Sequence, residues 1–430
     1  MTDARQIPVD LASADRLRAQ GLTYRLIDTA SDADAEAFLR ADTRGFLDAE
    51  PEADVVAADH EGIRERRNIG VFEADAPVGT WPVATVNSWV APLTVPGGEL
   101  GMWAISSVTV SGTHRRRGIA RALLEGELRA AASAGVPIAG LTASEATIYG
   151  RYGFAPAVPV AKVIVDTRRA GWAAPAPAGR VEYVDKDALP TTVATVHDVE
   201  RTQRAGQIAG WPRRWGRMTG VAPGNPSAAK VRGVRYVDGE GNVRGVLVYT
   251  LEDIPGAFRS EMQISLLSAV TPDALSALWS FALQHDLVDR VTADLRPVDD
   301  PLPWMVQDPR GVEIRVHDHG WLRILDVVAV LEARTYRAPL DLVLRVDDSL
   351  GFAAGTWRLT VTDGRAAVVW AESGIPDAVL DVATLSALYV GGVSATQLRN
   401  AGRLDAAAEV AASIDDAFRA VQAPVLGIWY

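Results

Sequence analysis

The segment between Met102 and Thr142 restricts the fold of this chain more than any other. Met102–Val110 is apolar enough for a buried strand, and Arg116–Ala134 repeats apolar residues at the spacing of one helical face. Gly135-Val136-Pro137 ends this helix, and Ile138–Thr142 predicts a short following strand. The order strand, glycine turn, helix, strand therefore predicts a mixed α/β region over roughly the first 165 residues.

Other segments of this first region fit the same class of fold. The polar stretch Ser31–Asp48 is compatible with a helix, and apolar runs follow near Gly70–Phe72 and Val83–Val95. A stretch rich in Pro, Ala and Gly, Gly171–Arg180, then predicts a linker. At 430 residues the chain is long enough for about three domains.

The middle region repeats the α/β order without a basic turn. Val231–Val237 and Val243–Leu251 predict a hairpin turned at residues 238–241. A strand at Leu266–Val270 leads into a helix at Pro272–His285, which Thr271 can cap, and Val291–Arg296 returns as a strand. We interpret this region as a second α/β unit that cannot hold the ligand of the first.

From about Trp321 the pattern changes to short alternating strands followed by helices. The expected strands are Leu342–Val346, Thr356–Val361 and Ala366–Ala371, and the expected helices are Asp381–Tyr389, Ser394–Asn400 and Asp405–Ala420. The last residues, APVLGIWY, are apolar and partly aromatic, whereas chain ends are commonly polar and frayed. We therefore expect the end of this chain to be packed against something.

Composition excludes several classes of function. The chain has no cysteine, which excludes a disulfide framework, a thiolate zinc site and a cysteine nucleophile. A formal charge of −11 argues against non-specific nucleic-acid binding; it fits a cationic substrate, although solubility alone explains it as well. No apolar run reaches membrane-spanning length and no signal peptide is evident, so we expect a cytoplasmic protein.

The histidines suggest no metal site. His317 and His319 alternate along an expected strand, which would place both rings on one face of an exposed edge without an evident third ligand. A zinc site needs at least three protein ligands, so we expect no metal.

The turn that precedes the first helix is the candidate anion site. A strand-to-helix turn presents unpaired N–H groups, and the helix dipole adds positive charge. Gly118 lets a phosphate approach the backbone, and four arginines supply charge: Arg115, Arg116, Arg117 and Arg121. The pattern suits a diphosphate but matches neither the P-loop nor the three-glycine dinucleotide motif. Taken alone, a basic helix start on a solvated face explains it equally well.

In context, the turn resembles that of the GNAT acetyltransferase superfamily. V-x-V at Val108–Val110 precedes R-R-x-G-x-A, and Y-G-R-Y-G-F follows at Tyr149–Phe154. HRRRG and ASEATIYGRYGFAPA resemble more closely the Eis family of actinobacterial acetyltransferases. WLRILDVVAVLEARTY and LSALYVGG are similar to the sterol-carrier-like C-terminal domain of that family.

The resemblance implies an α/β (α+β) fold of two tandem GNAT-like domains, the second degenerate, and a sterol-carrier-like α/β domain. The implied boundaries are 1–168, 169–318 and 319–430. The first domain would hold acetyl-coenzyme A (acetyl-CoA) as co-substrate, and the third would supply the terminal carboxylate. The family also implies a homohexamer, a trimer of dimers, that acts on small-molecule amines and has neither nucleic acid nor membrane as a partner.

Site residues follow position by position from the same resemblance. Tyr149 stands at the position of the general acid, and Tyr430 at the position whose terminal carboxylate acts as base. The residues matching the cofactor site are Val108, Thr109, Val110, Arg115, Arg116, Arg117, Gly118, Ile119, Ala120, Arg121, Ser144 and Glu145. Tyr430 departs from a frequent Phe in its side chain but supplies the same carboxylate.

The implied chemistry is plausible for these groups. A tyrosine with a pKa of about 10 stays protonated at neutral pH and can donate to a thiolate whose reference pKa is about 8.5. A free α-carboxyl with a pKa of about 3.5 is a weak base for an ammonium, so positioning the amine would supply most of the rate. The structural alternatives are that Tyr149 only packs, that Tyr430 only anchors the tail and that Glu145 caps a helix.

The substrate is less constrained than the cofactor. An aminoglycoside or polyamine is the first expectation. Acetylation of lysine side chains or protein N-termini is the second, and a non-catalytic lipid or regulatory binder is the third. Trp429 stands where family members can have an acidic residue, and Arg44 and Gly45 stand where another acid would be expected. Trp81, Trp89 and Trp103 are candidates for the wall of a substrate pocket.

Overall fold

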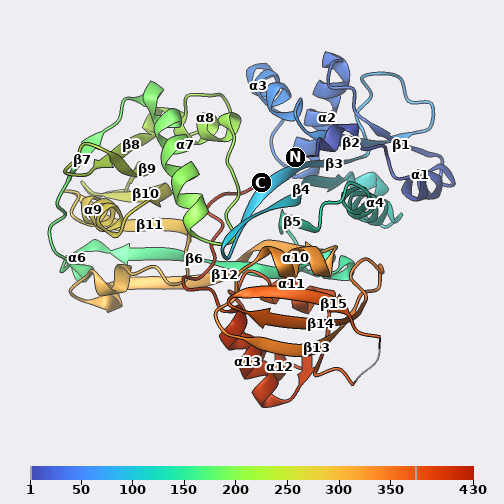
Figure 1. The fold of residues 1–430 in the computed structure, drawn as a ribbon. Helices are drawn as coiled ribbons and strands as arrows, with labels where there is room; N and C mark the ends of the chain where they lie inside the picture. The colour runs from blue at the N-terminus through green and yellow to red at the C-terminus, as the bar shows by residue number, and fades with distance from the viewer. Residues whose placement is uncertain (1, 373–374) are drawn as a thin grey trace. The chain divides into compact units, whose positions relative to one another are not determined.

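The computed structural model describes residues 2–372 and 375–430, which form two compact units (Figure 1). Unit 1 comprises Met1–Ala157, Gly320–Ala420 and Tyr430. Unit 2 comprises Val158–His319 and Val421–Trp429. The middle of the sequence, together with the segment just before the last residue, therefore forms one unit, and both ends of the chain belong to the other.

The first part of unit 1 is a mixed sheet with helices. Its strands follow the order β1-β2-β3-β4-β5-β12, with β4 and β5 parallel and the other neighbours antiparallel. The strands are β1 (Leu22–Leu26), β2 (Arg67–Glu73), β3 (Ala84–Val95), β4 (Gly98–Val110), β5 (Ile138–Thr142) and the end of β12 (Val312–Ile324). The helices are α1 (Leu11–Arg18), α2 (Asp32–Gly45), α3 (Ala53–Ile63), α4 (Ile119–Ser133) and α5 (Ala146–Tyr149).

Helix α4 confirms the predicted apolar face and corrects the predicted start. Ile119, Leu123, Leu124 and Leu128 are all buried in the core of this part. The helix begins at Ile119 and not at Arg116, because Arg116 (φ 62°) and Gly118 (φ 73°) adopt left-handed backbone conformations. The basic residues before Ile119 therefore belong to a turn and not to the first helical turn.

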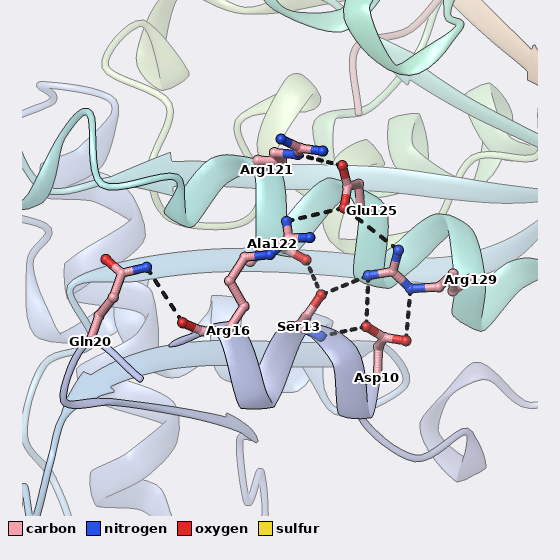
Figure 2. A network of polar contacts seen from close by, with 8 residues as sticks. All are labelled: Asp10, Ser13, Arg16, Gln20, Arg121, Ala122, Glu125 and Arg129. Atoms are coloured by element: carbon pink, nitrogen blue, oxygen red, sulfur yellow. Dashed lines mark hydrogen bonds and ion pairs between the residues drawn. The ribbon is translucent and has the colours of Figure 1, made fainter. Parts of the chain in front are cut away.

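Polar side chains tie α1 to α4, as Figure 2 shows. Asp10 caps α1 by accepting from the Ser13 N–H and pairs with Arg129 of α4 at 2.8 Å. Ser13 donates to the Ala122 carbonyl at 2.6 Å, and Arg16 pairs with Glu125 at 3.1 Å. These contacts fix α4, whose N-terminus adjoins the basic turn, against a helix formed by the first residues of the chain.

A fully buried ion pair joins α4 to the sheet. Glu127 of α4 pairs with Arg67 of β2 at 3.1 Å, and both side chains are 0% exposed. Glu127 also accepts from the Ser88 hydroxyl of β3 and from the Trp103 indole N–H of β4, so the charge is hydrogen-bonded on several sides. A buried charge persists in a core only when it is paired in this way.

The C-terminal part of unit 1 is a second sheet with helices. Its strands follow the order β15-β14-β13-β16-β17. They are β13 (Leu340–Asp347), β14 (Gly355–Thr362), β15 (Arg365–Trp370), β16 (Ala378–Asp381) and β17 (Leu404–Ala406), with α10 (Val327–Ala333), α11 (Val382–Leu388), α12 (Ala395–Asn400) and α13 (Ala408–Phe418). The predicted helix at Asp405–Ala420 was wrong at its start, because Leu404–Ala406 pairs with β16 as a strand.

Unit 2 repeats the order strand, helix, parallel strand. Its strands run β6-β11-β10-β9-β8-β7, with β10 and β11 parallel. They are β6 (Ala155–Asp166, of which Val158 onward lies in this unit), β7 (Arg180–Tyr183), β8 (Arg232–Val237), β9 (Val243–Asp253), β10 (Ser260–Ala269) and β11 (Val288–Arg296). The helices are α6 (Thr167–Ala170), α7 (Leu189–Glu200), α8 (Pro212–Thr219) and α9 (Pro272–Leu283).

Two expectations about unit 2 have clear outcomes. The β8–β9 hairpin and the Thr271 cap of α9 are confirmed, since Thr271 accepts from the Ala274 N–H. The exposed position expected for His319 is wrong, because this side chain is buried and its Nε2 lies 3.0 Å from the Ile428 carbonyl oxygen. No group of three or more His, Asp or Glu side chains within the described residues could hold a metal ion.

Breaking the buried Arg67–Glu127 pair should destabilise the fold more than breaking an exposed ion pair. Glu127→Ala leaves the Arg67 guanidinium unpaired in the core, so we expect the free energy of unfolding to fall by about 3–5 kcal/mol. Asp341→Ala breaks the Arg358–Asp341 pair, in which both side chains are at least half exposed, and should cost less than about 1 kcal/mol. Urea denaturation followed by circular dichroism measures both; equal losses would contradict this role of Glu127.

Candidate active site

The central feature of unit 1 is the place where its two parallel strands separate. β4 and β5 pair at Met102–Ile138, Trp103–Ala139 and Ala104–Gly140. β4 then continues to Val110 and β5 to Thr142 without further pairing between them. The edge of β4 that faces this gap, including Val108–Val110, therefore has no β5 backbone to bond. An extended ligand with amide groups can pair there, as the resemblance implies.

A β-bulge in β4 marks the start of this free segment. The register with β3 shifts between Asn87–Ser106 and Thr85–Thr109, and Ser107 adopts a left-handed φ of 55°. The Thr85 hydroxyl donates to the Ser107 carbonyl at 2.8 Å and so supports the bulge. A bulge bends its strand and strengthens its twist, which here turns β4 away from β5. The pattern of apolar and polar residues along this strand did not predict the bulge.

The basic turn leads from β4 to an uncapped helix. Gly118 occupies the N-cap position of α4 without a side-chain cap, so the first N–H groups of the helix have no partner from a capping side chain. A Cβ at Gly118 would meet no atom within 4 Å, so there is open space beside this residue. Glycine is favoured here because of its left-handed φ of 73° and not because of close packing. Together with the helix dipole, this geometry suits a diphosphate.

The four arginines of the turn are not equivalent. Arg115 and Arg116 are exposed and make no hydrogen bond or ion pair with the rest of the described chain. Arg117 donates to the Gln20 carbonyl at 3.1 Å. Arg121 is held by Glu125 at 2.6 Å, in the network of Figure 2. Arg115 and Arg116 therefore remain free to contact an anion, whereas Arg121 is already paired.

Tyr149 ends the short helix α5 and lies in the core on the α4 side of the sheet. Its ring packs against Phe154 and Trp321, with centroids 6.3 and 6.5 Å away. Burial raises the pKa of its phenol above the ordinary value of 10.0; a hydrogen bond with Ser144 opposes this and the charge of Glu145 adds to it. The phenol is therefore protonated at neutral pH. Glu145 precedes the helix, but its side chain makes no capping hydrogen bond.

A second buried ion pair supports the loop that carries Tyr149. Arg323 of β12 donates to the Tyr152 carbonyl at 3.0 Å and binds both carboxylate oxygens of Asp348, at 2.7 and 2.8 Å. The Arg323 and Asp348 side chains are essentially unexposed. The loop after α5 is therefore fixed to the C-terminal part of unit 1.

Tyr430, the last residue, lies beside the end of β5. Thr142 donates its hydroxyl to the main-chain oxygen of Tyr430 at 2.6 Å. The Tyr430 ring contacts the Trp89 ring edge-on, with centroids 5.6 Å apart. A Cβ at Gly140 would lie 2.3 Å from the Met102 sulfur and 3.0 Å from the Tyr430 hydroxyl, so glycine at this position makes room for both side chains. Residues 288 positions apart thus meet in one site.

The two tyrosines approach the sheet from opposite faces. Side chains alternate along a strand, so Gly140 and Thr142 face one side and Leu141 the other. Tyr430 lies on the side of Gly140 and Thr142, whereas Leu141 shares the core of α4 with Tyr149. Tyr149 and Tyr430 therefore lie on opposite faces of the sheet.

The three tryptophans expected to line a pocket lie in different surroundings, and packing explains the glycine at position 45. Trp103 is fully buried against Glu127 and cannot line a pocket, whereas Trp89 contacts Tyr430. Trp81 lies under the Arg44 guanidinium. Gly45 packs so closely on β4 that a Cβ would lie 2.3 Å from the Thr109 Cβ. An acidic side chain at Gly45 is therefore excluded by packing.

Sequence reasoning missed Asp42, three residues before Gly45 on α2. Ser107 at the bulge donates to its Oδ2 at 3.1 Å, and Oδ1 is buried. Burial raises the pKa of Asp42 to about 7, the Ser107 hydrogen bond opposes this, and the charge of Asp59 adds to it. The three-residue spacing from Gly45, which places Asp42 toward the same sheet, is the signal that could have revealed it.

Asp42 makes stability depend on pH. Its folded pKa lies above its unfolded value near 3.8, so its contribution is complete below pH 3.8 and is lost as pH rises through about 7. An asparagine side chain at this position has no proton to lose. As pH rises from 5.5 to 8, we expect the free energy of unfolding of Asp42→Asn to increase by about 2 kcal/mol relative to that of the native chain, measured by urea denaturation. The exposed Asp405→Asn is the control; parallel curves for Asp42→Asn and the native chain would contradict the raised pKa.

Searches for similar families give consistent matches along the chain. Residues 26–157 match an acetyltransferase (GNAT) domain, residues 206–324 match another acetyltransferase (GNAT) domain, and residues 327–427 match a sterol carrier protein domain. GNAT domains imply acetyl-CoA as co-substrate. No helix in the described part of the chain is long and apolar enough to cross a membrane.

Relatives cover nearly the whole chain. An N-acetyltransferase of Streptomyces griseus is 35% identical over 414 residues, 93% of this chain and 98% of the relative. N-acetyltransferase Eis of Mycobacterium tuberculosis is 32% identical over 323 residues, 73% of this chain and 76% of Eis. The crystal structure of Eis1 from Mycobacterium abscessus superposes with a TM-score of 0.80 at 30% identity, covering 95% of this chain and 100% of Eis1. The chain therefore belongs to the Eis family of N-acetyltransferases, with two GNAT domains and a C-terminal sterol carrier protein domain.

Proposed function

We propose that this enzyme transfers the acetyl group of acetyl-CoA to primary amines of aminoglycoside-like or polyamine substrates. One observation supports the proposal: Thr142 donates to the main-chain oxygen of Tyr430 at the end of β5, on the face opposite to Tyr149, so a terminal carboxylate of Tyr430 would lie there. A direct transfer needs a proton donor toward the leaving sulfur and an acceptor toward the attacking nitrogen. Two such groups adjoin one gap in the sheet.

The basic turn and the gap would hold the co-substrate. The uncapped N-terminus of α4 with Arg115 and Arg116 suits the diphosphate, and the unpaired edge of β4 at Val108–Val110 suits the amide groups of the pantetheine arm. Arg117, Ala120 and the backbone groups of Thr109 and Ile119, whose side chains are buried, would complete this wall, with Ser144 and Glu145 at its end. Arg121 pairs with Glu125 one turn further along α4, so it would add positive charge near the helix start while keeping this partner.

Tyr149 and Tyr430 would handle the protons. The amine nitrogen attacks the acetyl carbonyl and the carbon–sulfur bond breaks. Tyr149, kept protonated by burial, donates to the leaving sulfur. The Tyr430 carboxylate attracts the ammonium and accepts its proton, although the hydrogen bond from Thr142 favours the charged carboxylate and keeps it a weak base. Positioning of the amine against the thioester would therefore supply most of the rate.

The chemistry of the site favours a cationic substrate. Asp42 lies at the bulge of β4 and, once ionised, would attract an ammonium, in line with the net charge of −11. We also propose the division at 1–168, 169–318 and 319–430, a homohexameric assembly and a cytoplasmic location, which the family resemblance supports.

The amine class is tested by release of coenzyme A thiol from acetyl-CoA with aminoglycosides, polyamines and lysine peptides. We expect release with the first two classes. The same assay on a chain extended past Tyr430 by a short tag should show at least about a tenfold lower rate, because the extension converts the carboxylate to an amide.

The matched control carries the same tag at the N-terminus and should keep full activity. Release with peptides alone would assign protein acetylation instead, and no release with any amine would leave a non-catalytic binder. Unchanged turnover of the C-terminally extended chain would refute the role of the carboxylate.

Removing the Tyr149 hydroxyl tests the acid. Tyr149→Phe keeps the ring contacts with Phe154 and Trp321, so we expect kcat to fall about a hundredfold with little change in the KM for acetyl-CoA. Tyr152→Phe, a buried neighbour in the same core, is the control and should keep kcat within about twofold. Steady-state kinetics measures both variants; similar kcat values for the two would argue against a catalytic Tyr149.

A further inference from the structure

Unit 2 contains a second parting of parallel strands. β10 and β11 pair from Ser260–Val288 to Ile264–Ala293, after which β10 continues to Ala269 without β11. The register between β10 and β9 shifts between Ile264 and Leu266, which places a bulge at Ser265. The same combination of parallel pairing, bulge and parting defines the site in unit 1.

This second gap cannot hold a diphosphate in the same way. Only Val270 and Thr271 separate β10 from α9. The Thr271 hydroxyl accepts from the Ala274 N–H and so occupies the helix N-terminus. Pro272 has no N–H, and Asp273 places a negative charge in the first turn. Each feature opposes anion binding, in contrast to the uncapped α4.

Groups of the chain itself occupy the gap instead. Arg296 of β11 donates to the Leu267 carbonyl of β10 at 2.5 Å and pairs with Asp300 at 2.9 Å. The Ser268 hydroxyl donates to Glu200 of α7 at 2.6 Å. A small pocket that remains is lined by residues of both strands and by Val425 and Gly427 of the C-terminal segment.

Backbone groups of the C-terminal segment 423–428 are bonded along their length by unit 2. The Ala423 N–H donates to Asp299 at 2.8 Å, and its carbonyl accepts from Arg204 at 3.1 Å. The Val425 N–H donates to the Ala205 carbonyl at 2.9 Å, the Gly427 N–H donates to Gln207 at 3.0 Å, and the Ile428 carbonyl accepts from His319 at 3.0 Å.

The fit of this segment is close. Val425, Leu426 and Ile428 are at most 3% exposed. Gly206 lies against the segment, where a Cβ would come within 2.9 Å of the Val425 carbonyl oxygen. Burial lowers the pKa of His319 to about 4, so its ring is neutral at physiological pH and can donate only through a protonated Nε2. A free chain end would fray without such contacts.

We propose that unit 2 anchors the C-terminal segment beside its parted strands, with Gln207, His319 and Gly206 as positioning residues, and that this anchor restrains Tyr430 through the peptide bond that follows Trp429. One peptide bond joins Trp429 to Tyr430, so the hold on residues 423–428 limits how far Tyr430 can move. The degenerate GNAT domain thus uses the part of its fold that would take a co-substrate to hold its own chain. This inference rests on the proposed role of the Tyr430 carboxylate.

The experiment combines hydrogen exchange with kinetics on the full chain. Gln207→Leu removes the acceptor of the Gly427 N–H. We expect the amides of 423–430 to exchange about tenfold faster by mass spectrometry, and kcat to fall about tenfold or more with the acetyl-CoA KM within about twofold. Gln207→Glu keeps an accepting oxygen at the same place and should restore most of both properties.

A glycine pair tests the anchor without removing a polar group. Gly206 (φ 94°) and Gly241 (φ 89°) have similar left-handed backbones, so alanine strains both equally. A Cβ at Gly241 meets no atom within 4 Å, whereas a Cβ at Gly206 meets the Val425 carbonyl. We expect Gly206→Ala, and not Gly241→Ala, to accelerate exchange of 423–430 and to lower kcat.

The outcomes separate this inference from the proposed function. Unchanged exchange of 423–430 in both Gln207→Leu and Gly206→Ala would overturn the anchor. Faster exchange with unchanged kcat would overturn the positioning role if a C-terminal tag still abolishes transfer. If the tag is also harmless, the anchor stands and the carboxylate mechanism fails.

Discussion

The rest of this structure depends on the separation of two parallel strands that begin as hydrogen-bonded neighbours. β4 and β5 pair over Met102–Ala104 and then part, and the bulge at Ser107 turns the free end of β4 away. The separation leaves backbone groups of β4 without partners from β5, which is costly unless another molecule bonds them. It also opens a gap beside the end of β5, where Thr142 contacts Tyr430.

Both units contain a pair of parallel strands that separate, but the groups beside the gap differ between them. In unit 1 the turn before α4 is long, basic and uncapped, so its N–H groups stay available to a ligand. In unit 2 the loop before α9 is two residues long, and Thr271 and Pro272 close the helix start. Arg296 and Glu200 then bond groups of β10 beside the gap, and Val425 and Gly427 line the small pocket that remains. We therefore propose two roles for one geometry, ligand binding in unit 1 and attachment of residues 423–428 in unit 2.

Buried ion pairs fix the elements around the gap of unit 1. Glu127 joins α4 to β2, β3 and β4, and Arg323 joins the loop after Tyr149 to Asp348. Such pairs add little net stability relative to apolar packing, but they demand a particular geometry because an unpaired buried charge is costly. They therefore fix where α4 and Tyr149 lie, which is what a reaction between bound groups requires.

The sequence by itself determined the mixed α/β class, the α4 face, the Thr271 cap, the basic turn and the family. Each depends on local periodicity, capping or contiguous motif residues, which act over a few positions. Only the tertiary structure decided that α4 starts at Ile119, that Leu404–Ala406 is a strand, that Trp103 and His319 are buried and that Asp42 lies at the bulge. It also brought Thr142 to Tyr430 and the segment 423–428 to Gln207 and His319. These contacts join residues about 65 to 290 positions apart or depend on strand pairing, and no local pattern encodes which distant groups meet.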